Sequence, residues 1–159
     1  MPEKCIFCKL RQDGDFAFET KEFFGRFDRF PVTPGHLEVI PKRHVASFFG
    51  LTRAEELDLL TALRRGVTET LQTSDLRTLY RRFVENPINE KSAEFSKAAL
   101  LELESGKTRD GENIGVNNGI AAGRTVEHLH IHIIPRYVGD VPDPSGGVRH
   151  TIPGKGYYK

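Results

Sequence analysis

The sequence has almost no net charge, few cysteines and no long hydrophobic run. Of its 159 residues, 23 are Lys or Arg and 22 are Asp or Glu, so the formal net charge is +1. This balance argues against bulk attraction to nucleic acid or to a membrane surface. No apolar run reaches membrane-spanning length, and the first residues carry no apolar signal segment. We expect one domain, 1–159, since a chain of this length with 38% apolar residues can bury a core. The absence of an apolar signal segment leads us to expect it in the cytoplasm.

The only two cysteines, Cys5 and Cys8, are separated by two residues. They are too close for a disulfide that staples a domain, and they indicate a metal or redox role in a reducing compartment. A redox pair would favour a strand-to-helix position in a thioredoxin-like pattern, which is missing here. Zinc would need two more ligands. Two free thiols in a reduced protein are the remaining alternative.

Hydrophobic periodicity predicts an α+β fold with an antiparallel sheet of about five strands and helices on one side. The strands are expected over 16–19, 23–27, 36–40, 113–117 and 128–134. Pro41 and Pro135 are expected to end the third and fifth strands. A capping box at Thr52 and Glu55 predicts the start of a helix of about five turns. Its apolar stripe is Leu57, Leu60, Leu63, Val67 and Leu71.

Three histidines, His128, His130 and His132, alternate with Leu129, Ile131 and Ile133. Successive side chains of a strand point to opposite faces, so the three imidazoles are expected to share one face. Packing does not require three titratable rings in a row, so this face is a candidate site. A metal site, an acid–base site and a nucleophile for phosphorus are the three alternatives.

Nucleophilic attack needs one ring nitrogen with an outward lone pair, while the other nitrogen donates a hydrogen bond that sets the tautomer. The middle ring, His130, is best placed for this role. The preceding segment, 117–125, contains glycines and offers backbone amides, polar side chains and the Arg124 guanidinium to phosphate oxygens. From the residues alone, the metal and covalent alternatives have equal support.

The motifs around this strand resemble those of the histidine triad family of nucleotide hydrolases and transferases. The segment from Gly123 to Arg136 is similar to the family's histidine-φ-histidine-φ-histidine-φ-φ signature. Further matches are Cys5-Ile6-Phe7-Cys8, Phe27-Asp28, Pro34-Gly35-His36, Ile40-Pro41-Lys42-Arg43-His44 and Val116-Asn117. The tail, 139–159, resembles the bacterial branch related to diadenosine tetraphosphate hydrolases. The resemblance implies a homodimer that extends its sheet across the subunit interface.

The resemblance also implies a role for each matching residue. His130 would be the nucleophile, with His36 as a buried supporting ring. The other implied sites are phosphate contacts at His132, Asn117 and Thr125, a base pocket at Ile6, Phe7 and Phe27, and a ribose contact at Asp28. Taken singly, Phe7 and Phe27 are better explained as core residues, and Asp28 could equally form a turn. In zinc-bearing relatives, positions like His44 and His128 complete a structural zinc site with Cys5 and Cys8.

Two features depart from the family pattern. Arg124 stands where many members have glutamine, and it either strengthens phosphate binding or turns to solvent. Residues 74–108 are longer than the usual connection, apparently by two short helices near 76–83 and 93–103. A solvated surface insertion is the simplest interpretation of this segment. A cap over the site, a dimer surface and a partner-binding surface are alternatives.

The implied reaction is attack by His130 on the α-phosphorus of an adenine dinucleotide polyphosphate or a nucleoside phosphoramidate. Water then hydrolyses the nucleotidyl-histidine intermediate. Magnesium is expected only as a companion of polyphosphate substrates. The alternatives are a nucleotidyltransferase or phosphorylase, and a nucleotide-binding regulatory module with little turnover whose partner surface is 74–108.

Overall fold

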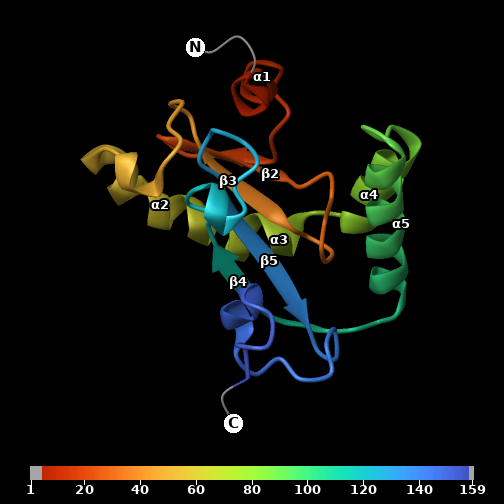
Figure 1. Cartoon of the computed structure of the whole chain (residues 1–159). Coiled ribbons are helices and arrows are strands. Elements are labelled where there is room, and N and C mark those ends of the chain that lie inside the picture. The colour runs from red at the N-terminus through yellow and green to blue at the C-terminus, as the bar shows by residue number, and fades with distance from the viewer. Residues whose placement is uncertain (1–4, 158–159) are drawn as a thin grey trace.

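Five antiparallel strands form one open sheet in the order β1-β2-β3-β5-β4. The structure is a computed structural model that describes residues 5–157 (Figure 1). The strands are β1 (Phe18–Glu19), β2 (Phe23–Phe27), β3 (Leu37–Pro41), β4 (Arg109–Gly115) and β5 (Ile131–Tyr137). This architecture confirms the predicted α+β class and the number of strands.

The helices of the described chain include one that the sequence analysis did not predict, α1 (Ile6–Gln12). The others are α2 (Arg53–Arg64), the π-helical turn η2 (Arg65–Thr70), α3 (Leu71–Thr73), α4 (Leu76–Glu85) and α5 (Glu90–Glu104). Short 3₁₀ turns are η1 (Phe48–Gly50), η3 (Ile120–Ala122) and η4 (Gly147–Thr151). Within 5–157, no helix has both the length and the apolar character needed to cross a bilayer.

One face of the sheet packs against α2, η2 and α3, and it forms the larger core. In register, Phe27 of β2 lies beside Leu37 of β3, which lies beside Ile133 of β5, so the three side chains share this face. Gly66 brings η2 close to the sheet, because a Cβ there would lie only 2.9 Å from Ile133 Cδ1. The long helix therefore needs glycine at its point of closest approach.

The predicted helix at 52–71 is confirmed in position but only partly in its apolar stripe. Its N-cap is the expected capping box, with Thr52 Oγ1 accepting from the Glu55 amide and Glu55 Oε2 accepting from the Thr52 amide at 2.7 Å. Leu63 packs on the core as expected, whereas Leu57 and Leu60 are exposed. Leu59 and Ala62 take the core-facing positions in that part of the helix, whereas Val67 and Leu71 pack on the core as predicted.

The strand that carries the histidines starts later than predicted. It begins at Ile131, because its partner β3 ends at Pro41, which has no N–H with which to continue the ladder beyond the Val39–Ile131 pair. The Leu129 amide instead donates to the carbonyl of Val45 at 2.6 Å. Pro135 does not end the strand, which continues to Tyr137. The strand predicted over 113–117 is also displaced, and β4 covers Arg109–Gly115.

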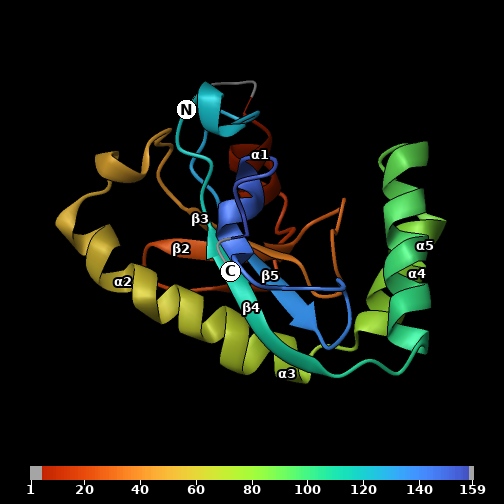
Figure 2. The same cartoon turned by 60° about the horizontal axis from the view of Figure 1, so that its bottom comes forward.

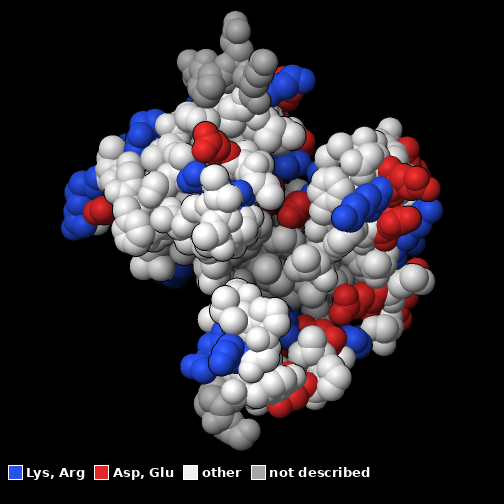
Figure 3. Space-filling view, viewed as in Figure 1, with Lys and Arg blue, Asp and Glu red and all other residues white. Residues whose placement is uncertain are grey.

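Helices α4 and α5 form an antiparallel pair beside the sheet (Figures 1 and 2). They confirm the two helices predicted within 74–108. The Tyr80 hydroxyl accepts a hydrogen bond from the Gly35 amide at 2.7 Å, and the Arg29 guanidinium lies 4.1 Å from the centre of the Phe83 ring. These contacts join the pair to the β2–β3 connection. On the face shown in Figure 3, most acidic side chains lie on the right-hand side, where basic side chains also occur, and the left edge is mainly basic.

Candidate active site and metal centre

Five of the six histidines gather on the sheet face opposite the long helix. The rings of His44 and His128 lie 4.8 Å apart, and those of His130 and His132 lie 5.0 Å apart. Phe7 of α1 lies between the two groups, with its ring 5.8 Å from His128 and 5.1 Å from His130. The cluster therefore has two halves on either side of one aromatic ring.

The first half is a four-residue set suited to a metal ion. Cys5, Cys8, His44 and His128 each offer one ligand atom, and these atoms lie within 4.8 Å of one another. His128 Nδ1 lies 3.3 Å from Cys5 Sγ and 3.6 Å from Cys8 Sγ, and His44 Nδ1 lies 3.5 Å from Cys8 Sγ. Tetrahedral zinc with ordinary bond lengths requires a sulfur–nitrogen separation of about 3.5 Å. The four residues therefore fit zinc.

The protonation of His128 also suits a metal ligand. Its Nε2 lies 2.9 Å from the carbonyl oxygen of Pro41, which can only accept, so Nε2 carries the proton and Nδ1 presents its lone pair to the two sulfurs. Burial lowers the pKa of His128 and keeps the ring neutral. Burial, followed by Cys5, raises the pKa of the Cys8 thiol, and a bound cation is what would stabilise its thiolate.

In the second half, His130 has the opposite arrangement. Its Nδ1 lies 2.9 Å from the carbonyl oxygen of His128, so Nδ1 donates and Nε2 keeps its lone pair. The side chain is largely buried, with 8% of the residue's surface exposed. This is the tautomer that nucleophilic attack by the middle histidine requires.

His132 completes a hydrogen-bonded series with His36 and Asp28. His36 Nε2 lies 3.0 Å from His132 Nδ1, and His36 Nδ1 lies 3.3 Å from an oxygen of Asp28. Burial lowers the pKa of His36, and it lowers the pKa of His132 to about 4. The other Asp28 oxygen accepts from the Phe30 amide at 2.8 Å. Asp28 thus forms a turn, which was one of the two alternatives, and it also orients His36. A ribose hydroxyl would therefore bind a carboxylate that already has two partners within the protein.

The Arg124 side chain, on the loop before β5, is held by contacts within the protein. Gly119 and Gly123, with φ of +109° and +90°, flank the turn η3. The Arg124 guanidinium donates to the Ala46 carbonyl at 3.0 Å and pairs with Glu127 at 3.3 Å. Arg124 therefore does not turn freely to solvent, and its guanidinium ties this loop to the segment before η1.

The predicted base-pocket residues are divided between the two faces of the sheet. Phe7 contacts the His130 ring, and Ile6 is the exposed residue before it on α1. Phe27 belongs to the core on the long-helix side, away from His132, because side chains alternate along β2 and β5. The structure thus supports core packing for Phe27 and separates it from the histidines.

A model of the HIT domain matches residues 9–139, which is most of the chain. The chain belongs to the HIT family. A 31% identical relative is a bis(5'-nucleosyl)-tetraphosphatase (asymmetrical) from Schizosaccharomyces pombe, matched over 88% of this HIT protein and 59% of the yeast protein. An AP-4-A phosphorylase from Mycobacterium tuberculosis is 25% identical over 81% of this chain and 50% of its own length. The chain thus spans only part of both enzymes, and the matches do not single out a bacterial branch.

Solved structures of the family share the fold. A HIT family protein from Bacillus anthracis superposes with a TM-score of 0.55 at 27% identity, over 86% of this chain and 76% of that one. A zinc-bound histidine triad protein from Mycobacterium smegmatis gives a TM-score of 0.55 at 26% identity, over 88% and 84% of the two chains. The fold of this HIT protein and its Cys/His cluster are therefore compatible with zinc.

Sequence reasoning missed a buried ionic pair on the histidine face of the sheet. Arg26 of β2 lies 3.3 Å from Glu38 of β3, and Glu38 is in register with His132 of β5. Burial, followed by Asp28, raises the pKa of Glu38 to about 8 although Arg26 opposes this shift. Arg26 and Glu38 are each the one charged residue of a strand, and in the sheet both align with His132. A single charged residue within each of two neighbouring strands was the sequence signal that could have revealed the pair.

Proposed function

We propose that this HIT protein is a nucleotide hydrolase in which His130 Nε2 carries the nucleotidyl group between substrate and water. The observation that carries the proposal is the hydrogen bond from His130 Nδ1 to the His128 carbonyl, because it leaves Nε2 as the nucleophilic nitrogen. The substrates are dinucleoside polyphosphates or nucleoside phosphoramidates, and the first class is in line with the dinucleotide activities for which two of the relatives are named.

The reaction has two displacement steps at the α-phosphorus. The Nε2 lone pair forms a phosphorus–nitrogen bond while the bond to the leaving group breaks, and its electron pair goes to the leaving oxygen or nitrogen. An amine leaving group takes a proton from solvent. Water then attacks the same phosphorus, the histidine bond breaks, and the nucleoside monophosphate departs as the ring regains its tautomer.

We assign the remaining contacts from the resemblance of the matching residues to the family's motifs. His132, Asn117 and Thr125 bind the non-bridging phosphate oxygens, Asp28 takes the ribose, and the base lies against Ile6 and Phe7. His36 orients His132 through their 3.0 Å contact. Arg124 supports this site indirectly, since its guanidinium fixes the loop that contains Thr125.

Zinc held by Cys5, Cys8, His44 and His128 has a structural role in this proposal, because four protein ligands leave no open coordination position. It would join α1 to His128, whose carbonyl in turn orients His130. Magnesium accompanies only polyphosphate substrates. Zinc-binding thiolates suit the reducing cytoplasm. A homodimer that extends the sheet would use an edge strand, and β4 is the longer of the two edges.

The experiment is single-turnover reaction with labelled diadenosine tetraphosphate and with adenosine 5'-phosphoramidate, quenched in base to preserve a phosphohistidine. We expect a labelled protein adduct that decays to AMP, and a loss of turnover of at least about a thousandfold in His130→Gly. The variant should keep its metal content and bind AMP. Equal turnover in wild type and variant would exclude the enzymatic function.

The second candidate is a phosphorylase, favoured by the similarity to the mycobacterial enzyme. It differs only in the acceptor, because inorganic phosphate in place of water converts the adduct to ADP. Adding phosphate to the preformed adduct and measuring AMP and ADP separates the two reactions. A regulatory module, with α4 and α5 as its partner surface, would bind nucleotide without forming the adduct.

A further inference from the structure

The insertion at 74–108 has an inner face that packs on the connection between β2 and β3. This connection, 28–36, begins with Asp28 and ends with His36, which are two members of the hydrogen-bonded series that reaches His132. The Asp28 amide donates to the His36 carbonyl at 2.9 Å, so the two ends of the connection lie side by side. An element that holds this connection therefore holds both side chains.

The helix pair α4–α5 contacts the connection at both of its ends. Near the start, the Arg29 guanidinium donates to the carbonyl of Asn86, the residue that ends α4. The next residue, Phe30, has its ring 6.2 Å from the ring of Phe95 on α5. Near the other end, the connection contacts Tyr80 of α4. The inner face of the insertion is thus engaged with the segment that carries two site residues, which argues against a purely solvated surface insertion.

Tyr80 makes the contact that lies nearest to the histidines. Its side chain is fully buried, and its hydroxyl accepts from the Gly35 amide at 2.7 Å, one residue before His36. The Tyr137 hydroxyl donates to the Pro34 carbonyl at 3.0 Å. The two tyrosines, one from α4 and one from β5, thus hold both polar groups of the same peptide. Rotation of this peptide would leave buried polar groups without partners, so its orientation is fixed.

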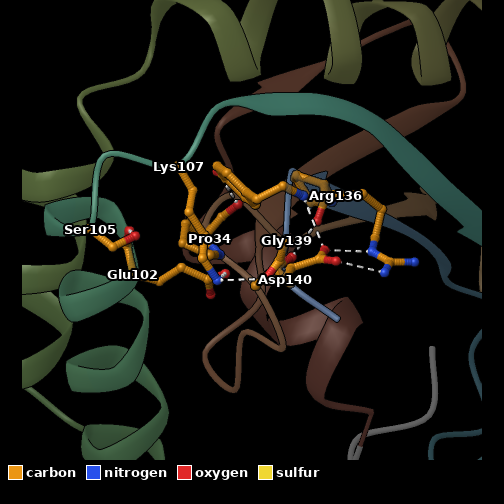
Figure 4. A network of polar contacts seen from close by, with 10 residues as sticks. Pro34, Glu102, Ser105, Lys107, Arg136, Gly139 and Asp140 are labelled. Carbon is orange, nitrogen blue, oxygen red and sulfur yellow. Dashed lines mark hydrogen bonds and ion pairs between the residues drawn. The ribbon is translucent and has the colours of Figure 1, made fainter. Parts of the chain in front are cut away.

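The chain that follows α5 is attached to the same region of the molecule. Lys107 donates to the Gly139 carbonyl at 3.1 Å, just beyond the end of β5 (Figure 4). The Arg136 guanidinium pairs with Asp140 at 2.7 Å in this network, in which Figure 4 also shows Pro34. The helix pair is therefore fastened beside the sheet at both ends of the insertion. Tyr80 is thus presented by a supported helix, which positions a side chain more closely than a loop does.

We infer that the insertion at 74–108 positions the histidine series and that Tyr80 is its positioning residue. The Tyr80 hydroxyl fixes the peptide before His36, this peptide sets the place of the His36 ring, and that ring orients His132 through their 3.0 Å contact. The inference rests on the proposed function for its effect on the reaction, in which His132 binds the phosphate. The placement of the two rings is independent of any substrate.

The test is Tyr80→Phe, which keeps the aromatic ring and removes the acceptor of the Gly35 amide. In the protein without substrate, we expect the imidazole nitrogen resonances of His36 and His132 to shift, while those of the Cys/His cluster stay in place. The rate of adduct formation from adenosine 5'-phosphoramidate should fall about tenfold, because a small misplacement of a positioned group slows the chemical step. The Kd of AMP should change less than about twofold, since the defect acts on the chemical step and not on nucleotide binding.

Ala99→Gly is the matched control. Ala99 is buried on α5 and takes part in none of the contacts named above. Glycine weakens a helix interior, so this variant loosens the insertion without removing the Tyr80 hydroxyl. We expect a lower urea midpoint of unfolding, unchanged histidine resonances and an unchanged rate of adduct formation. If Ala99→Gly shifts the resonances and slows the reaction as Tyr80→Phe does, the insertion acts through packing alone and the inference is wrong.

The outcomes separate this inference from the proposed function. Unmoved resonances of His36 and His132 in Tyr80→Phe would overturn the inference whatever the activity, and so would shifted resonances with an unchanged rate of adduct formation. If wild type forms no adduct, the proposed function fails, while the resonances still decide whether Tyr80 positions the rings. If Tyr80→Phe does not fold, Tyr137→Phe removes the other hydrogen bond of the same peptide and must show the same shifts.

Discussion

His128 and His130 are two residues apart on the same face, yet their rings are prepared for opposite tasks. His128 donates from Nε2 to the Pro41 carbonyl and presents Nδ1 to two sulfurs. His130 donates from Nδ1 to the His128 carbonyl and presents Nε2. In each case, a backbone carbonyl selects the tautomer. The comparison shows that the partner of the second nitrogen decides whether a histidine of this motif suits a metal or phosphorus.

The two halves are also linked through the backbone. His128 contributes its ring to the Cys/His cluster and its carbonyl oxygen to the hydrogen bond that orients His130. Phe7 contacts both rings from α1, the helix that begins beside Cys5 and contains Cys8. Loss of the metal centre should therefore disturb the reactive ring, while loss of the reactive ring should leave the metal centre intact.

The largest expected effect comes from His128→Asn. Removing one of four ligands should abolish stoichiometric zinc binding and lower the free energy of unfolding by more than about 4 kcal/mol, because metal binding contributes directly to folding. His130→Asn should keep the zinc content and cost only about 1 kcal/mol of unfolding free energy, since it loses the ring contact with Phe7. Metal analysis and urea unfolding of the two variants measure the asymmetry. Equal zinc content in both variants would show that the halves are not divided as described.

Arg26→Met tests the buried pair that borders the reactive half. It removes the hydrogen-bond partner of the buried Glu38, whose pKa of about 8 keeps most of the carboxyl protonated at pH 7, so we expect a loss of about 1–3 kcal/mol in unfolding free energy. The double variant Arg26→Met/Glu38→Leu removes both charges and should recover most of that loss. If the double variant is as unstable as the single one, the pair acts through packing and not through charge.

The pH dependence of stability tests His132. Its pKa is about 4 in the folded protein, against about 6.5 in an unfolded chain. The unfolded state then binds more protons between these values, so unfolding free energy should fall as pH decreases from about 6.5 toward 4. His132→Asn should show a shallower decrease over the same range. Titration of the zinc ligands affects wild type and variant alike. If unfolding free energy falls with pH equally steeply in both, a group other than His132 is responsible for the decrease.

The smallest effect is expected for Phe7→Leu. Leucine keeps most of the buried apolar area but loses the ring contacts to His128 and His130, which are worth about 1 kcal/mol. We expect a small loss of stability together with a modest fall in the rate of adduct formation. Zinc content should not change. If only the stability or only the rate of adduct formation changes, Phe7 supports only one half of the histidine cluster.

The elements that sequence predicted best are those with a strong local signal. The capping box at Thr52, the aromatic-rich strand β2 and the strand β3 next to Pro41 are present as expected. The boundaries of β5 and the face of Phe27 were missed, because both depend on which strand lies alongside and where Pro41 interrupts the ladder. Helix α1 was also missed, since seven residues carry too little periodicity to identify a helix.

By itself, the amino-acid sequence determined the strand and helix types and placed three imidazoles at alternate positions, because these follow from local periodicity. Only the tertiary structure decided what each imidazole is for. The hydrogen-bonding partner of a ring nitrogen can be a backbone carbonyl far away in the sequence, which sequence spacing does not position. The Pro41 carbonyl, which accepts from His128, is an example. The hydrogen bond from the Gly35 amide to Tyr80 likewise depends on how α4 packs beside the sheet.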